Sequence, residues 1–176
     1  MRRNIVLCGF MGCGKSTVGK LLSKITGIPF ADLDEIIENN AGMRISEIFA
    51  RFGEQHFRDL EYEAAKTLSE APGVILSTGG GALVFDRNAA ALKKSGDIVL
   101  LDLPLFVARE RLKGDTTRPM LQKPDRDAAM KELFYKRLPR YKAAADVVVN
   151  AAQPPVDVCR DIISALSLSQ KNEIGP

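Results

Sequence analysis

The chain has 176 residues, 45% hydrophobic and 27% charged, which predicts one domain, residues 1–176, with a full core. The net charge of +3 argues against a nucleic-acid partner, and no apolar segment approaches the about 20 residues that span a membrane. A single histidine excludes histidine-based metal sites and Ser-His-Asp triads, and three scattered cysteines indicate reduced thiols and a cytoplasmic location.

The first motif of the chain is a phosphate-binding loop. Residues 9–16 read GFMGCGKS, which fits the pattern G-x-x-x-x-G-K-[ST], and Thr17 follows. Glycines let backbone N–H groups point at phosphate oxygens, Lys15 can reach the β- and γ-phosphates, and the Ser16 hydroxyl can ligate Mg²⁺. An apolar strand at residues 4–8 precedes the loop and an amphipathic helix follows it, as the motif requires. The sequence therefore predicts a site for a nucleoside triphosphate and Mg²⁺.

Acidic residues end the second predicted strand, which begins at Phe30 and runs to Asp34. Asp32 and Asp34 thereby stand at the carboxyl end of a strand, where open α/β sheets bind their ligands. Asp34 is a candidate to orient a substrate hydroxyl for attack; a helix cap is the alternative role for such an acid. Helical patterns follow at residues 34–40, 45–49 and 53–70.

Two arginines are candidate ligands for a carboxylate, because a guanidinium fork binds a carboxylate through two parallel hydrogen bonds. Arg58 lies on the polar flank of the helix predicted at 53–70, together with Glu61. Arg137 stands in the segment KRLPRY at residues 136–141. Each arginine taken singly is also explained by a surface position beside a glutamate, so the residues alone leave both interpretations open.

Three consecutive glycines, Gly79, Gly80 and Gly81, follow the strand predicted at residues 74–77. A run of glycines costs conformational entropy, and close approach of a ligand to the backbone is one reason for it. A flexible loop between strand and helix is the alternative.

The remaining elements expected are a helix at 86–95, a strand at 97–103, a helix at 104–113, a helix at 126–145 that Pro139 kinks or ends, a strand at 146–150 and a helix from 154.

Five apolar strands that alternate with helices predict an α/β protein, in which helices cover both faces of a five-stranded parallel sheet. With the phosphate loop after the first strand, this is a P-loop NTPase fold. Residues 114–126, which contain Arg118, carry no apolar periodicity and are predicted to form a lid. The acceptor-binding segment is expected at about residues 32–62, and the polar tail at 170–176 is expected to be disordered.

The fold alone does not choose among kinases, GTPases and transporter ATPases. The chain lacks the guanine-specifying pattern N-K-x-D of GTPases, and it is too small for a remodelling machine with extra modules. A small chain with a basic lid favours phosphoryl transfer to a small metabolite, because the lid excludes water from the reaction.

Six segments together resemble the shikimate kinase family, in its order and spacing, across residues 4–165. They are GFMGCGKST at 9–17, DLD at 32–34, FRDLE at 57–61, STGGG at 77–81, RPML at 118–121 and RLPRY at 137–141. The resemblance implies transfer of the ATP γ-phosphoryl group to the 3-hydroxyl of shikimate. The products are shikimate 3-phosphate and ADP, on the route to chorismate and the aromatic amino acids.

The resemblance also implies a role for each matching residue. Glu61 would brace Arg58, Asp32 would hold the Mg²⁺ cofactor through water, and Ser16 would ligate it directly. The residues implied in catalysis are Lys15, Asp34 and Arg118. Those implied in binding ATP are Gly12, Cys13, Gly14, Lys15, Ser16, Thr17 and Arg118. Those implied in binding shikimate are Asp34, Arg58, Gly79, Gly80, Gly81 and Arg137.

Three positions depart from the family pattern. Met120 replaces a common leucine at similar volume, and Arg140 adds a charge near Arg137, which leaves open which of the two grips the carboxylate. Gln153 lies about one residue from the family's contact with adenine.

We expect a monomer whose partners are ATP and shikimate. The alternatives are a gluconate-type kinase of another small metabolite and a nucleotide-binding module without catalysis.

Overall fold

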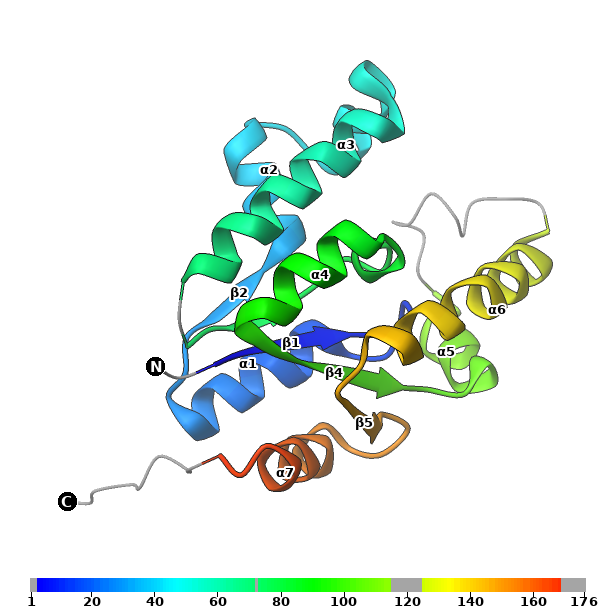
Figure 1. Ribbon diagram of the computed structural model, residues 1–176. Coiled ribbons are helices and arrows are strands. Elements are labelled where there is room, and N and C mark those ends of the chain that lie inside the picture. The colour runs from blue at the N-terminus through cyan, green and yellow to red at the C-terminus, as the bar shows by residue number, and fades with distance from the viewer. Residues whose placement is uncertain (1–2, 72, 115–124, 169–176) are drawn as a thin grey trace.

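The computed structural model describes residues 3–71, 73–114 and 125–168. Its centre is a parallel sheet of five strands in the order β2-β3-β1-β4-β5 (Figure 1). The strands are β1 (Asn4–Cys8), β2 (Phe30–Asp32), β3 (Ile75–Ser77), β4 (Gly96–Asp102) and β5 (Val147–Asn150). The predicted parallel sheet with helices on both faces is confirmed.

Helices cover both faces of this sheet. α1 and α7 lie together on one face, and α3, α4 and α6 lie toward the other (Figure 1). The helices are α1 (Lys15–Thr26), α2 (Leu33–Ala41), α3 (Ile45–Glu70), α4 (Asp86–Ser95), α5 (Leu105–Arg111), α6 (Arg126–Ala144) and α7 (Pro155–Ala165), with a short 3₁₀ turn, η1 (Ala82–Val84). The connections place every strand's carboxyl end at the same edge of the sheet, where open α/β folds bind ligands.

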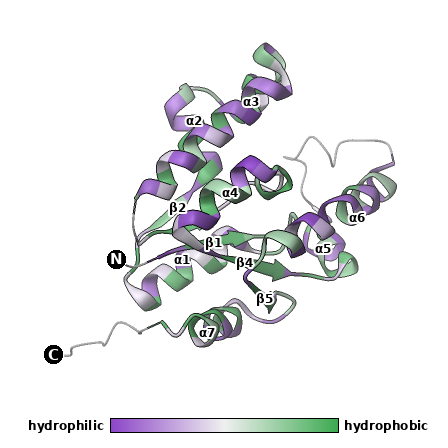
Figure 2. Cartoon of the chain, viewed as in Figure 1, coloured by the Kyte–Doolittle hydropathy of each residue, from purple (hydrophilic) through white to green (hydrophobic). Residues whose placement is uncertain are grey.

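Burial explains why the sequences of the inner strands β3, β1 and β4 are mainly apolar. All five residues of β1 are buried, because helices pack on both of its faces. Figure 2 shows most of β1 and of β4 in the hydrophobic colour, whereas the covering helices alternate between the two colours. That alternation is typical of amphipathic helices that turn one face to a core.

The start of α2 differs from the sequence-based expectation, and of the two effects expected of Pro139, the helix end is not found. The second strand ends at Asp32, whose side chain accepts a hydrogen bond from the Asp34 backbone N–H at 3.1 Å and caps α2. Asp34 therefore lies in the first turn of a helix, not at the end of a strand. α6 continues through Pro139, because Tyr141 and Ala144 beyond it are buried in the core and packing outweighs the lost backbone hydrogen bond.

The helical run from Ile45 to Glu70 breaks at Gly53, as the sequence predicts. Gly53 has φ 81° and ψ 175°, which bends α3 there. Most of the predicted lid, including Arg118, and the predicted disordered tail lie outside the described residues. Within the described ranges, no helix is long and apolar enough to cross a membrane.

Candidate active site

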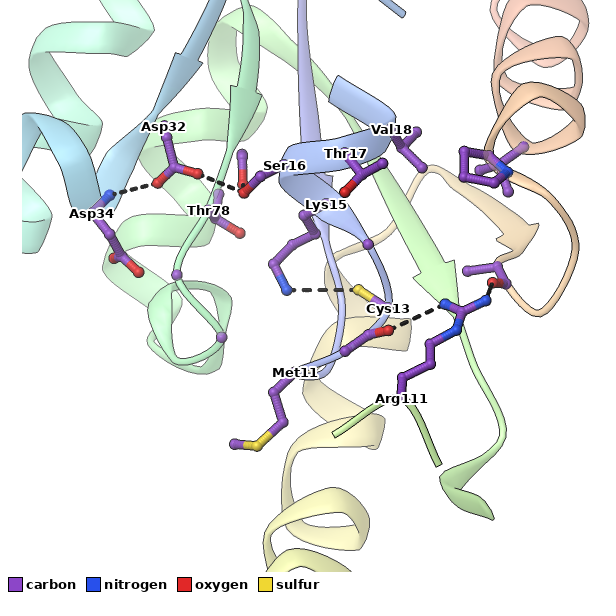
Figure 3. A pocket seen from close by; sticks show the side chains of 18 of the residues that line it. Met11, Cys13, Lys15, Ser16, Thr17, Val18, Asp32, Asp34, Thr78 and Arg111 are labelled. Atoms are coloured by element: carbon purple, nitrogen blue, oxygen red, sulfur yellow. Dashed lines mark hydrogen bonds between the residues drawn. The ribbon is translucent and has the colours of Figure 1, made fainter. Parts of the chain in front are cut away.

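A cavity of about 580 Å³ opens at the carboxyl edge of the sheet (Figure 3). The phosphate loop forms its floor, Asp32 and Asp34 stand on one side, and Arg111 stands on the other. Gly79 and Gly80 complete the wall beside Asp34. Its volume lies in the range of pockets that hold ligands of nucleotide or metabolite size.

The glycines of the phosphate loop are required by its backbone. Gly9, Gly12 and Gly14 have φ of 143°, 80° and 92°, a region that side chains rarely adopt. A Cβ on Gly9 would also lie 2.7 Å from the Leu101 carbonyl oxygen. Since Gly14 is the N-cap, no side chain in the described part of the chain caps the start of α1. The first N–H groups of α1 are thus directed to an anion in the cavity.

Lys15 ties the loop together. Its ammonium donates to the carbonyl oxygens of Gly9 and Phe10, at 2.8 and 3.3 Å, and lies 3.6 Å from the Cys13 sulfur. The Cys13 side chain is buried, and its backbone N–H donates to the Phe10 carbonyl oxygen at 3.2 Å. Cys8 is also buried, which raises the pKa of its thiol to about 12 and keeps it protonated.

Oxygen atoms suited to a hard cation meet beside the loop. The Ser16 hydroxyl donates to Asp32 Oδ2 at 2.8 Å. The Ser77 Oγ lies 3.5 Å from the Ser16 Oγ. Among the described residues, no three or more His, Cys, Asp or Glu side chains gather as a metal cage. Mg²⁺ is commonly bound by one or two protein oxygens plus substrate phosphates and water, so this donor set fits it.

Each of the three consecutive glycines lies against one predicted acceptor-binding side chain. A Cβ on Gly79 would lie 2.7 Å from Asp34 Oδ1, one on Gly80 would lie 3.3 Å from an Arg137 nitrogen, and one on Gly81 would lie 2.8 Å from an Arg58 nitrogen. Gly81 has φ −105°, so it needs glycine for space, not for conformation. The glycine run therefore lets three charged side chains converge on one backbone segment.

Arg58 is held by acidic partners on its own helix. Its Nη1 donates to Glu61 Oε2 at 3.1 Å, and its Nη2 donates to Glu54 Oε1 at 3.1 Å. Glu61 is 1% exposed, and this burial raises its pKa, while Arg58 acts in the opposite direction. The predicted contact between Glu61 and Arg58 is thus present as a buried ion pair.

Arg137, and not Arg140, faces the glycines. Arg137 Nη1 donates to the Gly80 carbonyl oxygen at 2.9 Å, and the Tyr141 hydroxyl donates to the same oxygen. Burial raises the pKa of Tyr141 to about 12, so the hydroxyl keeps its proton at neutral pH. Arg140 instead pairs at the surface with Asp86, at 3.0 Å. Of the two arginines, Arg137 is therefore the one that lies beside the glycine run.

Arg111 is a cavity residue that the sequence reasoning missed. Its guanidinium donates to the Gly12 and Ala151 carbonyl oxygens, at 3.1 and 2.9 Å, and joins the phosphate loop to the turn after β5. Gln153 and Pro155 also line the cavity, and a contact of Gln153 with adenine stays a prediction. No local motif marks Arg111, because its partners lie 99 and 40 residues away along the chain.

Comparisons with known proteins agree with this geometry. A family model described as shikimate kinase matches residues 11–167. The shikimate kinase of Thermodesulfovibrio yellowstonii is 45% identical over 161 residues, which cover 92% of this chain and 93% of that protein. This chain belongs to the shikimate kinase family. The predicted family and the predicted class, an ATP-dependent kinase, are confirmed.

Solved structures of shikimate kinases superpose closely on the chain. The enzyme of Acinetobacter baumannii in complex with shikimate gives a TM-score of 0.89 at 33% identity and covers 99% of this chain and 97% of that one. The enzyme of Aquifex aeolicus gives 0.83 at 41% identity, with 93% and 96% covered. A gluconokinase of Sinorhizobium meliloti gives 0.59 at 19% identity, which shows a shared fold alone.

Proposed function

We propose that the chain transfers the γ-phosphoryl group of ATP to the 3-hydroxyl of shikimate and releases shikimate 3-phosphate and ADP. The observation that carries this proposal is the convergence of Asp34, Arg58 and Arg137 on Gly79–Gly81, next to the phosphate loop. Two guanidinium groups match the acceptor's carboxylate, and one carboxylate matches its hydroxyls. Membership of the shikimate kinase family supports the same substrate.

The phosphate loop would bind the ATP half of the reactants. Backbone N–H groups of residues 12–17 and the Lys15 ammonium would contact the β- and γ-phosphates. Ser16 would hold Mg²⁺ directly, and Asp32 would hold it through water. When bound, the ion neutralises charge on the phosphates. Arg111, Gln153 and Pro155 line the end of the cavity that remains for the nucleoside.

The acceptor half would be bound by the three side chains at the glycine run. Arg58 and Arg137 hold the carboxylate, so the hydroxyl to be phosphorylated lies toward Asp34. Asp34 orients that hydroxyl and accepts its proton as the bond to phosphorus forms. Because the transition state of phosphoryl transfer is loose, positioning and charge neutralisation supply most of the acceleration.

The lid and Arg118 complete the proposed site, although both stay predictions because residues 115–124 lie outside the described ranges. An arginine that neutralises the transferring phosphoryl group contributes about 10³–10⁵ in rate in other phosphotransferases. The monomeric state and the cytoplasmic location also stay predictions.

A coupled ADP-release assay with shikimate, gluconate or no acceptor tests the proposal. We expect turnover with shikimate only. Turnover with gluconate and not with shikimate would identify a different small-metabolite kinase. Absence of turnover with any acceptor, in a protein that binds ATP, would identify a nucleotide-binding module instead.

Substitution of Gly81 by alanine is expected to raise the KM for shikimate and leave the KM for ATP unchanged. The new methyl group would lie 2.8 Å from an Arg58 nitrogen, so the guanidinium has to leave the position from which it is proposed to bind the carboxylate. Gly80→Ala is the graded comparison, because its methyl group would lie 3.3 Å from Arg137 and require a smaller shift. Initial rates at varied shikimate measure both, and equal effects on the two KM values would contradict the prediction.

A further inference from the structure

We propose that the start of α4, residues 85–88, positions Arg58, and that the Phe85 ring thereby sets how tightly the acceptor carboxylate is bound. The inference rests on the proposed function, since it takes Arg58 as a ligand of that carboxylate. Three residues of this segment contact Arg58 or the residues that hold it, and they belong to α4 or are its N-cap residue, outside the predicted site.

Phe85 contacts the guanidinium itself. The Arg58 Cζ lies over the Phe85 ring at 5.0 Å from the ring centroid and over the Phe57 ring at 5.1 Å. A cation over an aromatic face is attracted by the ring quadrupole, and the ring consumes none of the five N–H donors. The two rings therefore restrict the position of the Arg58 guanidinium, while all of its N–H donors stay available to carboxylates.

Arg87 fixes the backbone beneath Arg58. Its Nη2 donates to the Arg58 carbonyl oxygen at 2.8 Å and to Asp59 Oδ1 at 2.7 Å. Its guanidinium also lies over the Tyr62 ring, at 4.9 Å from the centroid. These contacts join α4 to α3 beside Arg58. They therefore fix the position of the Arg58 backbone, from which its side chain extends.

Asn88 holds the buried partner of Arg58. It lies buried between α3 and η1, and its Nδ2 donates to Glu61 Oε2 at 3.4 Å and to the Ala82 carbonyl oxygen at 3.0 Å. Glu61 Oε2 is the same atom that accepts from Arg58. The Asn88 amide therefore orients the Glu61 carboxylate, and that carboxylate in turn orients the Arg58 guanidinium.

The other acidic partner of Arg58 contributes less to its orientation. The Glu54 side chain is 64% exposed, and ion pairs with exposed partners are worth little in water. The Arg58 side chain is 12% exposed, so its surroundings are mainly Glu61 and the two rings. Of these, Phe85 is the partner that can be changed most safely, because it is 36% exposed.

The test replaces Phe85 by leucine, which keeps an apolar side chain and removes the ring face, and by tyrosine, which keeps both. We expect Phe85→Leu to lower kcat/KM for shikimate about two- to fivefold, the range of an exposed cation–π contact, with the KM for ATP unchanged. Phe85→Tyr should retain the wild-type value. Phe106→Leu is the matched control, because Phe106 is a 69% exposed phenylalanine on α5.

A double-mutant cycle separates positioning from general packing. In an Arg58→Ala background, Phe85→Leu should change kcat/KM for shikimate no further, because the contact has already gone. An equal loss in both backgrounds overturns the inference, as does a leucine variant that matches wild type. In both cases the wild type still turns over shikimate and the proposed function stands. A wild type inactive with shikimate overturns both.

Discussion

Arg58→Ala is expected to weaken shikimate binding roughly 10- to 100-fold and to leave ATP affinity unchanged. Hydrogen bonds between charged groups are worth about 1.5–3 kcal/mol, which converts to that range. Arg58 contacts Gly81 and its acidic partners but does not line the nucleotide cavity, so the two affinities should separate. Calorimetric titration with each ligand measures them, and equal losses would contradict the proposed acceptor site.

The same substitution should also destabilise the fold. Glu61 is 1% exposed and would keep its buried charge without its cation, and breaking such a pair costs about 3–5 kcal/mol.

This loss of stability should depend on pH. A raised carboxyl pKa means that the folded chain holds the proton more tightly than the unfolded chain, so stability falls as pH rises from the unfolded value, about 4.3, to the folded one.

Loss of Arg58 raises the Glu61 pKa further and extends that interval upward. The variant's deficit in the free energy of unfolding should therefore be small near pH 4 and larger at pH 7. Urea unfolding at both pH values measures it. The control is Arg58→Ala with Glu61→Gln, which removes the buried charge and should recover most of the stability but none of the shikimate affinity. A deficit that is equal at both pH values would exclude Glu61 as its source.

The sequence predicted the parts of the site that are local. The phosphate loop was recognisable because its glycines, Lys15 and Ser16 act within a few residues of one another, in a backbone that only glycine permits. The pairing of Arg58 with Glu61, which the family resemblance implies, is compatible with their helical spacing, and the structure contains it. The run at Gly79–Gly81 indicated a close approach, although it could not say that Asp34, Arg58 and Arg137 are what approach.

What the sequence could not predict depends on distant contacts. Arg111 and Phe85 belong to no motif, and their partners lie far along the chain or on another helix. Pro139 reads locally as a helix end, yet the buried side chains beyond it keep α6 helical. Asp34 lies in a helix because the Asp32 side chain caps the first turn of α2. The strand β2 ends at Asp32, where its pairing with β3 ends, and such pairing cannot be read from local sequence.

Asp34→Asn is expected to lower kcat by about 10²–10⁴, the usual contribution of a side chain that accepts a proton in the transition state. Asparagine keeps the size of the side chain and one acceptor oxygen, so shikimate can still be bound and oriented. The KM for shikimate should therefore change much less than kcat. Initial rates over a range of pH measure both parameters.

Glu35→Gln is the matched control, since Glu35 is the neighbouring acid in the first turn of α2 and its side chain is exposed. It removes the same charge from the same turn, so the general field at the helix start changes equally in both variants. If kcat falls only for Asp34→Asn, the effect belongs to the carboxylate beside Gly79 and not to the helix charge. If kcat of Asp34→Asn stays within a few-fold of wild type, Asp34 positions the hydroxyl without accepting its proton. The loose transition state would then leave that proton until after the bond to the leaving oxygen has broken.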